Sequence, residues 1–202
     1  MAALDRPDAL QSPASYWHAY RSDFATAMAG VDGTAIDAAA ALIEATLRRD
    51  GWIFSCGNGG SSSISNHLQC DFAKGVRAGT SLKPKVMSLP ANLETSFAIA
   101  NDISFVEVFS HQLEGVGRPQ DLVITISSSG NSENVVRALD WARANAVQSI
   151  SLTGFDGGRT AKLADVNIHV PSHNYGVVED IHQSIMHVLS QYLRRKHTPP
   201  GG

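Results

Sequence analysis

Short apolar runs alternate with helix-like segments along residues 52–197, and this alternation constrains the fold more than any other feature of the chain. Each run is followed by a segment of helical periodicity, in several cases through glycine or serine. The runs are WIFSCG (52–57), KVMSL (85–89), DLVITIS (121–127), SISLTG (149–154) and VNIHVP (166–171). Strands that alternate with helices in this way form a parallel sheet covered on both faces. The sequence therefore predicts an α/β protein.

Residues 1–50 carry a different pattern, which predicts helices. Apolar side chains recur there every four residues, in a stripe of Tyr16, Tyr20, Phe24 and Met28. No linker or second domain is visible, and 202 residues suit one domain. We therefore expect a single domain over 1–202, made of N-terminal helices (1–50), an α/β core (51–197) and a flexible tail (198–202).

Composition excludes several classes of function. The 16 Lys+Arg and 19 Asp+Glu residues give a net charge of -3, which leaves no basic footprint for nucleic acid. The polar N-terminus does not resemble a signal peptide, and no apolar run approaches the ~20 residues of a membrane-spanning helix. We expect a cytoplasmic protein with neither a nucleic-acid nor a membrane partner. Cys56 and Cys70 are then expected to be reduced thiols, with a disulfide as the alternative.

Two loops of similar chemistry each join a predicted strand to a predicted helix. They are GNGGSSS (57–63) and SSSGNS (127–132). In a parallel sheet such loops share the face at which α/β proteins bind ligands. Helix N-termini offer free N–H groups, serine adds donors, and glycine permits close approach. The loops therefore predict a phosphate or phosphosugar site, although plain turns, with Ser132 as a helix cap, would use the same residues.

Two later segments supply acid–base residues. His67 and Asp71 are four apart, hence on one face of a helix. Near the C-terminus, EDIHQSIMH supplies Glu179, Asp180, His182 and His187. If the two helices cross, two histidines and two carboxylates converge in a number that Zn²⁺ accepts. Spacing alone does not choose among these residues, and a helix histidine is more often structural than a ligand.

Six segments in this order resemble the sugar isomerase (SIS) domain family and, within it, the phosphoheptose isomerases. They are CGNGGSSSISNH, AIANDISFVEVF, ISSSGNSENVVRAL, LTGFDGG, ADVNIHVP and EDIHQSIMH. The resemblance implies a three-layer αβα sandwich around a five-stranded parallel sheet. It also implies a homotetramer with active sites at subunit contacts, in which the N-terminal helices serve oligomerisation. The implied reaction converts sedoheptulose 7-phosphate to D-glycero-D-manno-heptose 7-phosphate through an enediol, at the entry to bacterial heptose synthesis.

The resemblance also assigns residues to roles. It implies a phosphate site of Ser127, Ser128, Ser129 and Ser132. It implies sugar contacts at Asn58, Gly59, Gly60, Ser61, Asn101 and Asp102, with Asp71 and Glu179 also facing the substrate. It implies a zinc site of His67, Asp71, Glu179 and His187. Asp71 would be the general base and His187 the general acid.

The chain departs from the family pattern at the sugar end. Asp71 replaces a family glutamate, which draws the base back by roughly 1 Å. Glu179 replaces a glutamine, and SHNYGVVED replaces an acidic pair and an arginine. Two alternatives therefore stay open: an isomerase of another phosphosugar, from a capsule or secondary-metabolite pathway, and a non-catalytic binder resembling the DnaA initiator-associating protein.

Overall fold

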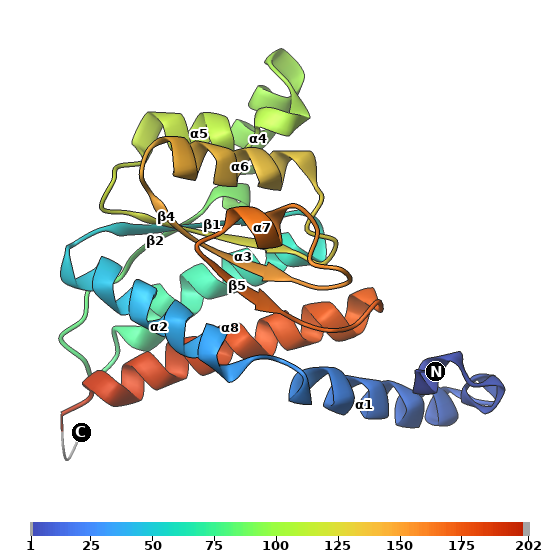
Figure 1. Cartoon of the computed structure of the whole chain (residues 1–202). Helices are drawn as coiled ribbons and strands as arrows, with labels where there is room; N and C mark the ends of the chain where they lie inside the picture. Colours follow the sequence, from blue (N-terminus) through green and yellow to red (C-terminus); the bar gives the residue numbers. More distant parts are fainter. Residues whose placement is uncertain (1, 200–202) are drawn as a thin grey trace.

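The computed structural model of the chain describes residues 2–199. It is a three-layer αβα sandwich in which one parallel sheet lies between two layers of helices (Figure 1), so the predicted fold class is confirmed. Of the tail predicted to be flexible, residues 200–202 lie outside the described residues.

The sheet has five strands in the order β2-β1-β3-β4-β5. Their bounds are β1 (Trp52–Gly57), β2 (Lys85–Ser88), β3 (Leu122–Ser127), β4 (Gln148–Thr153) and β5 (Val166–His169). β1 pairs in parallel with β2 on one side and with β3 on the other. The direction of winding reverses between β1 and β3, and such a switch point is where open α/β sheets bind ligands.

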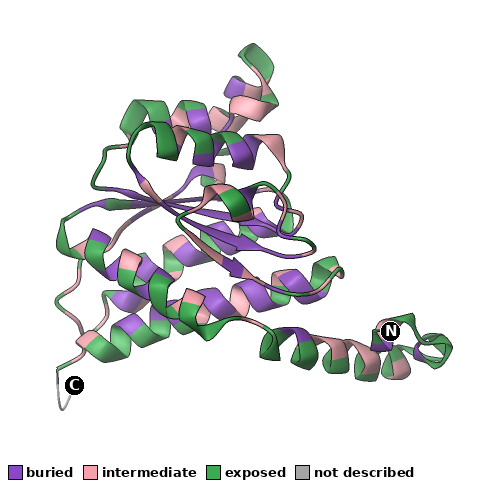
Figure 2. Cartoon of the chain, in the orientation of Figure 1, coloured by how far each residue is buried: buried purple, intermediate pink, exposed green. Residues whose placement is uncertain are grey.

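Three helices cover one face of the sheet: α2 (Gly33–Arg48), α3 (Gly60–Cys70) and α8 (Tyr175–His197). Their apolar sides meet alternate residues of the strands, such as Ile53 and Ile124, in the larger core cluster. Figure 2 shows the buried side of α8 turned toward the sheet and its outer side exposed. α3 and α8 therefore lie on the same layer, and each begins near the carboxyl ends of the strands.

The other face carries α4 (Leu93–Asp102), α5 (Ser110–Val116) and α6 (Glu133–Ala144). Phe54 and Val123, which point opposite to the first cluster, pack with these helices in a second core. The short α7 (Thr160–Leu163) precedes β5. Helices on both faces bury the three central strands β1, β3 and β4 apart from the first residues of β1 and β4, as expected for a parallel sheet, whereas the edge strands β2 and β5 are partly exposed.

Two short 3₁₀ helices, Ala3–Asp5 and Pro7–Leu10, precede the first α-helix, α1 (Pro13–Ala29). Figure 1 shows α1 extending away from the sheet beside the start of α8. Trp17, 61% exposed, and Tyr16, 42% exposed, lie on its surface. The oligomerisation role of these helices stays a prediction.

Within residues 2–199 no single helix has the length and apolarity to cross a membrane; α1 and α2 meet that test only together, across a 69° bend.

The helical run of α3 continues into a π-helical segment, Asp71–Val76. A π-helical turn is wider than an α-helical one and often occurs at functional sites. Asp71 is the first residue of this segment, and Phe72 beside it is fully buried. The change of helix type thus lies directly beside the predicted general base.

Candidate active site

The two glycine- and serine-rich loops meet at the carboxyl ends of β1 and β3. Asn58, after β1, and Asn134, in the first turn of α6, exchange two amide hydrogen bonds of 2.9 Å each. A reciprocal pair of this kind uses one donor and one acceptor of each amide and fixes both side chains. The loops predicted to share one face therefore form a single site.

A small pocket of about 130 Å³ opens between these loops and the start of α8. Most of the residues predicted to bind phosphate or sugar line it. The lining is Asn58, Ser61, Ile126, Ser127, Ser128, Ser129, Ser132, Tyr175 and Glu179. Of these, Ile126 and Tyr175 were not predicted; Tyr175 begins α8, and the sequence gives no sign that its ring reaches the serines.

Several serine hydroxyls of the pocket keep capacity for a ligand. Ser132 holds the N-cap position of α6, yet within residues 2–199 its side chain makes no capping hydrogen bond. Ser128 is 4% exposed, and its hydroxyl has no partner among the described residues. A buried hydroxyl without a partner is costly, so a bound acceptor would relieve it. With the free N–H groups of α6, these hydroxyls suit an anion.

The serine loop depends on glycine for its path. Gly130 has a φ of +62°, a conformation that side chains rarely adopt. A Cβ at Gly130 would lie 2.0 Å from the carbonyl oxygen of Gly157. The loops after β3 and β4 therefore cross in direct backbone contact, which holds the serines in place.

One stripe of α8 connects this pocket to the acid–base residues. Tyr175, Glu179, Gln183 and His187 follow one another at intervals of four residues, so they share a face. The first two line the serine pocket. His187, eight residues beyond Glu179, is about 12 Å further along the axis at 1.5 Å per residue.

At the far end of the stripe, His67, Asp71 and His187 come together. One ligand atom from each lies within 4.8 Å of the others, which makes the group capable of holding a metal ion. Asp71 Oδ1 is 3.3 Å from His67 Nε2, and Asp71 Oδ2 is 3.8 Å from His187 Nε2. The Ser190 hydroxyl donates to Asp71 at 3.4 Å. Three residues from two helices, distant in sequence, thus form one cluster.

Gln183 was not predicted to belong to this cluster. Its Nε2 lies 3.1 Å from His67 Nδ1 and 3.1 Å from His187 Nε2. The interval of four residues between Gln183 and His187 is visible in the sequence, but an uncharged amide does not by itself indicate acid–base or metal chemistry. The cluster therefore holds two imidazoles, a carboxylate and a carboxamide.

Glu179 lies at the serine pocket instead. A Cβ on Gly60 would be 2.3 Å from its Oε2, so its carboxylate rests against the first turn of α3. Burial, and then the charge of Asp180, raises the pKa of Glu179. The role of Glu179 as the fourth zinc ligand stays a prediction. Glu179 does not belong to the group of His67, Asp71 and His187, whose ligand atoms lie within 4.8 Å of one another.

Two residues that spacing left open as ligands have other partners. Asp180 accepts a hydrogen bond of 2.5 Å from the Tyr20 hydroxyl, which ties α1 to α8. Burial and this bond raise the pKa of Tyr20. His182 is fully buried, its Nε2 bonds the carbonyl oxygen of Thr153 at 3.1 Å, and burial lowers its pKa to about 4. His182 is therefore a neutral residue of the core.

Asn101 and Asp102, predicted to contact sugar, lie apart from the serine pocket and the histidine cluster. Both are exposed at the end of α4, on the opposite side of the sheet from α3 and α8. Within this chain they bond each other, at 2.8 Å from Asn101 Nδ2 to Asp102 Oδ1. Their sugar contacts stay a prediction.

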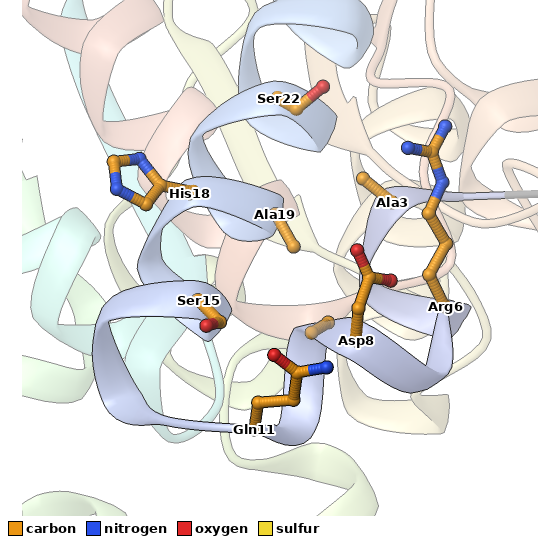
Figure 3. A pocket seen from close by; sticks show the side chains of 9 residues that line it. Ala3, Arg6, Asp8, Gln11, Ser15, His18, Ala19 and Ser22 are labelled. Atoms are coloured by element: carbon orange, nitrogen blue, oxygen red, sulfur yellow. The ribbon is translucent and has the colours of Figure 1, made fainter.

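A separate hollow of about 330 Å³ lies between the N-terminal 3₁₀ helices and α1. Figure 3 shows the side chains that line it, among them Asp8, Gln11 and, from α1, His18. Its polar side chains are mostly exposed and form no metal-capable group.

Cys56 is buried and Cys70 exposed, and the two remain free thiols as predicted.

Serine hydroxyls and a helix N-terminus at the switch point of a parallel sheet define the class of this protein. The family model of the SIS domain matches residues 17–154, and the chain belongs to that family. Its relatives include the phosphoheptose isomerase of Tolumonas auensis, 38% identical over 169 residues that cover 80% of this chain and 84% of the relative. Another is the phosphoheptose isomerase of Rhodospirillum rubrum, 38% identical over 77% of this chain and 82% of its own.

A solved structure of the phosphoheptose isomerase from Neisseria gonorrhoeae has a similar fold. Its TM-score is 0.83 at 29% identity, over 90% of this chain and 99% of that one. The enzyme from Francisella tularensis gives a TM-score of 0.84 at 26% identity, over 92% of this chain and 100% of that one. The resemblance identified from the six sequence segments is thereby confirmed.

Proposed function

We propose that the protein is a phosphosugar ketose–aldose isomerase that interconverts sedoheptulose 7-phosphate and D-glycero-D-manno-heptose 7-phosphate. The observation that carries the proposal is the shared stripe of α8, which has an anion pocket at one end and an acid–base cluster at the other. A separation of about 12 Å suits an extended seven-carbon chain with a terminal phosphate. Relatives named phosphoheptose isomerase support the choice of substrate.

The phosphate would bind in the serine pocket. Ser127, Ser128, Ser129 and Ser132 supply hydroxyls, and the start of α6 supplies backbone N–H groups. No lysine or arginine is among the residues that line the pocket. Arg159, nearby, is held by Glu133 at 2.5 Å. Charge compensation would therefore come from the helix dipole and oriented hydroxyls.

Asp71 would move the proton that the reaction requires. Its carboxylate takes a proton from C1 of the ketose, which leaves an enediol, and returns it to C2 to give the aldose. His187 would exchange protons with the two substrate oxygens as the carbonyl moves from C2 to C1. Because Asp71 is within 4 Å of both imidazoles, one carboxylate and one imidazole can face adjacent carbon atoms.

Zinc fits this cluster by the chemistry of its donors. Two imidazoles and a carboxylate are among the ligands that Zn²⁺ prefers, and His67, Asp71 and His187 would hold it. When bound, the ion would polarise the substrate carbonyl and favour the negative charge that develops on its oxygen. Glu179 would then contact the substrate between the phosphate pocket and the cluster.

We further propose a homotetramer that completes each site. Large apolar side chains are exposed on two helices, Trp17 at 61% on α1 and Phe97 at 70% on α4. Exposed apolar patches of this kind suit contacts between subunits. Asn101 and Asp102 follow Phe97 on α4 and would reach the sugar of a neighbouring subunit. The product would enter heptose synthesis.

A second candidate is isomerisation of a different phosphosugar. The favouring observation is an aromatic stack that reaches the pocket through Tyr175, which packs edge-on against Phe155 at 4.7 Å, while Phe155 stacks on His173 at 5.5 Å. Phe155 adopts a φ of +46°, which is strained for a bulky residue. Strain kept in direct contact with a pocket residue favours a role in selecting the sugar.

Turnover of a panel of ketose phosphates of five to seven carbons tests both candidates. The proposal expects the highest kcat/KM with sedoheptulose 7-phosphate. A preference for another sugar would select the second candidate. A folded, zinc-supplemented protein that binds phosphosugars and turns over none would indicate a binding module instead.

A further inference from the structure

Gln183 fills the space between the two histidines of the cluster. Its amide nitrogen is 3.1 Å from a ring nitrogen of each. The residue is half-buried on the stripe of α8 that faces α3. Its terminal amide therefore lies beside both imidazoles of the cluster, at Nδ1 of His67 and at Nε2 of His187.

A carboxamide has two faces of opposite character. With its nitrogen inward, the amide donates to both rings, as the geometry at Gln183 has it. Rotation by 180° about the last side-chain bond turns the carbonyl oxygen inward without moving the backbone. In that orientation Gln183 offers an oxygen donor beside both imidazoles.

Glu179 is held away from the cluster by other contacts. Its carboxylate rests on Gly60 and lines the serine pocket. It precedes Gln183 by one full turn of α8, which adds about 6 Å along the axis. To ligate the same metal, Glu179 would have to leave the first turn of α3.

We propose that Gln183, rather than Glu179, completes the donor set of His67, Asp71 and His187 around zinc. This inference rests on the proposed function only for the catalytic role of the zinc ion, not for its ligands. Asp71 would be the single anionic ligand, so the loaded site would keep one positive charge, whereas Glu179 as fourth ligand would neutralise it. A positive site favours the charge that develops on a substrate oxygen. Glu179 stays free for the substrate.

Calorimetric titration of Zn²⁺ into the metal-free, full-length protein tests the assignment without any turnover. Gln183→Met keeps the length of the side chain and removes the oxygen. It should weaken zinc binding by about tenfold or more. Glu179→Met, which removes the oxygen donors at that position in the same way, should change the affinity by less than about twofold. Gln191→Met, on an exposed part of the same helix two turns on, is the matched control and should behave as wild type.

The opposite pattern, with zinc binding lost in Glu179→Met and kept in Gln183→Met, would overturn the proposal. Circular dichroism checks that each variant is folded. If Gln183→Met does not fold, Gln183→Glu replaces it, because it retains an oxygen donor and should bind zinc at least as well as wild type. Failure of folded Gln183→Glu to bind would also overturn the assignment. A wild-type protein that binds no zinc yet isomerises sedoheptulose 7-phosphate would sink this inference and leave the proposed function standing.

Discussion

The carboxylate of Glu179 occupies the place that a side chain on Gly60 would need. A Cβ at Gly60 would lie 2.3 Å from Oε2 and 2.7 Å from Cδ of Glu179. Gly60 is the first residue of α3, and Glu179 reaches it from the first turns of α8. This contact fixes where the negative charge of Glu179 lies relative to the serine pocket.

Gly60→Ala should therefore act on substrate binding more than on folding. Alanine is tolerated at a helix start, so the free energy of unfolding should change by less than about 1 kcal/mol. The methyl group would displace the Glu179 carboxylate, and KM for the phosphosugar should change about threefold or more. Gly33→Ala is the matched control, since Gly33 begins α2 and a Cβ there meets nothing within 4 Å. Equal KM values for the two variants would contradict the placement of Glu179.

Glu179 should also make phosphate binding depend on pH. Burial raises the pKa of Glu179, so the folded protein favours the neutral acid. The stability that Glu179 contributes to the fold is therefore lost as pH rises through that raised pKa. An ionised Glu179 repels a phosphate in the same pocket, whereas the neutral acid donates a hydrogen bond. KM of wild type relative to Glu179→Gln should therefore rise from pH 5 to pH 8. A ratio independent of pH would show that Glu179 does not face the phosphate.

The serine hydroxyls should contribute to binding and little to the chemical step. Ser129→Ala with Ser132→Ala removes two donors to an anion, each worth about 1.5–3 kcal/mol. KM should rise at least about a hundredfold, while kcat falls by less than about threefold. Ser63→Ala, an exposed serine of α3 outside the pocket, is the control. A large fall in kcat at constant KM would place the phosphate elsewhere.

His182 should make the fold sensitive to acid. Its pKa is about 4 in the folded chain because it is buried, against about 6.5 when unfolded. A lowered histidine pKa means that stability is present above the unfolded value and is lost as pH falls toward the folded one. This residue alone should reduce the free energy of unfolding by about 2 kcal/mol between pH 7 and pH 5. Urea titrations of wild type and His182→Gln measure it, and the variant should lack that share of the decrease. Parallel curves for the two proteins would rule out this role.

Periodicity predicted much of the fold and fewer of the contacts at the site. All the strands formed near the expected residues, because each is an apolar run between turn residues. Helix α5 was missed, since among its residues Ser110–Val116 only Ser110 and Leu113 are buried, too few to give a helical pattern. The strand order was also out of reach, because pairing depends on contacts between distant segments.

The limits were similar at the candidate site. His67, Asp71 and the serine loops carry distinctive chemistry in short segments, so they could be selected from the sequence. Gln183 and the pair Asn58–Asn134 could not, because an amide is chemically neutral until its neighbours are known. Spacing also left Asp180 and His182 equivalent to Glu179 and His187. Only the rotation of α8 against the sheet separates the buried His182 from the stripe that faces α3.

Proton transfer by Asp71 is the central claim, and NMR in D₂O tests it most directly. Zinc-supplemented wild type should convert sedoheptulose 7-phosphate to the aldoheptose 7-phosphate with solvent deuterium at C2. Asp71→Asn, folded as judged by circular dichroism, should lose at least about a hundredfold in rate and in deuterium incorporation together. Wild-type turnover by Asp71→Asn would contradict the account. So would a folded wild-type protein that neither converts sedoheptulose 7-phosphate nor incorporates deuterium into it.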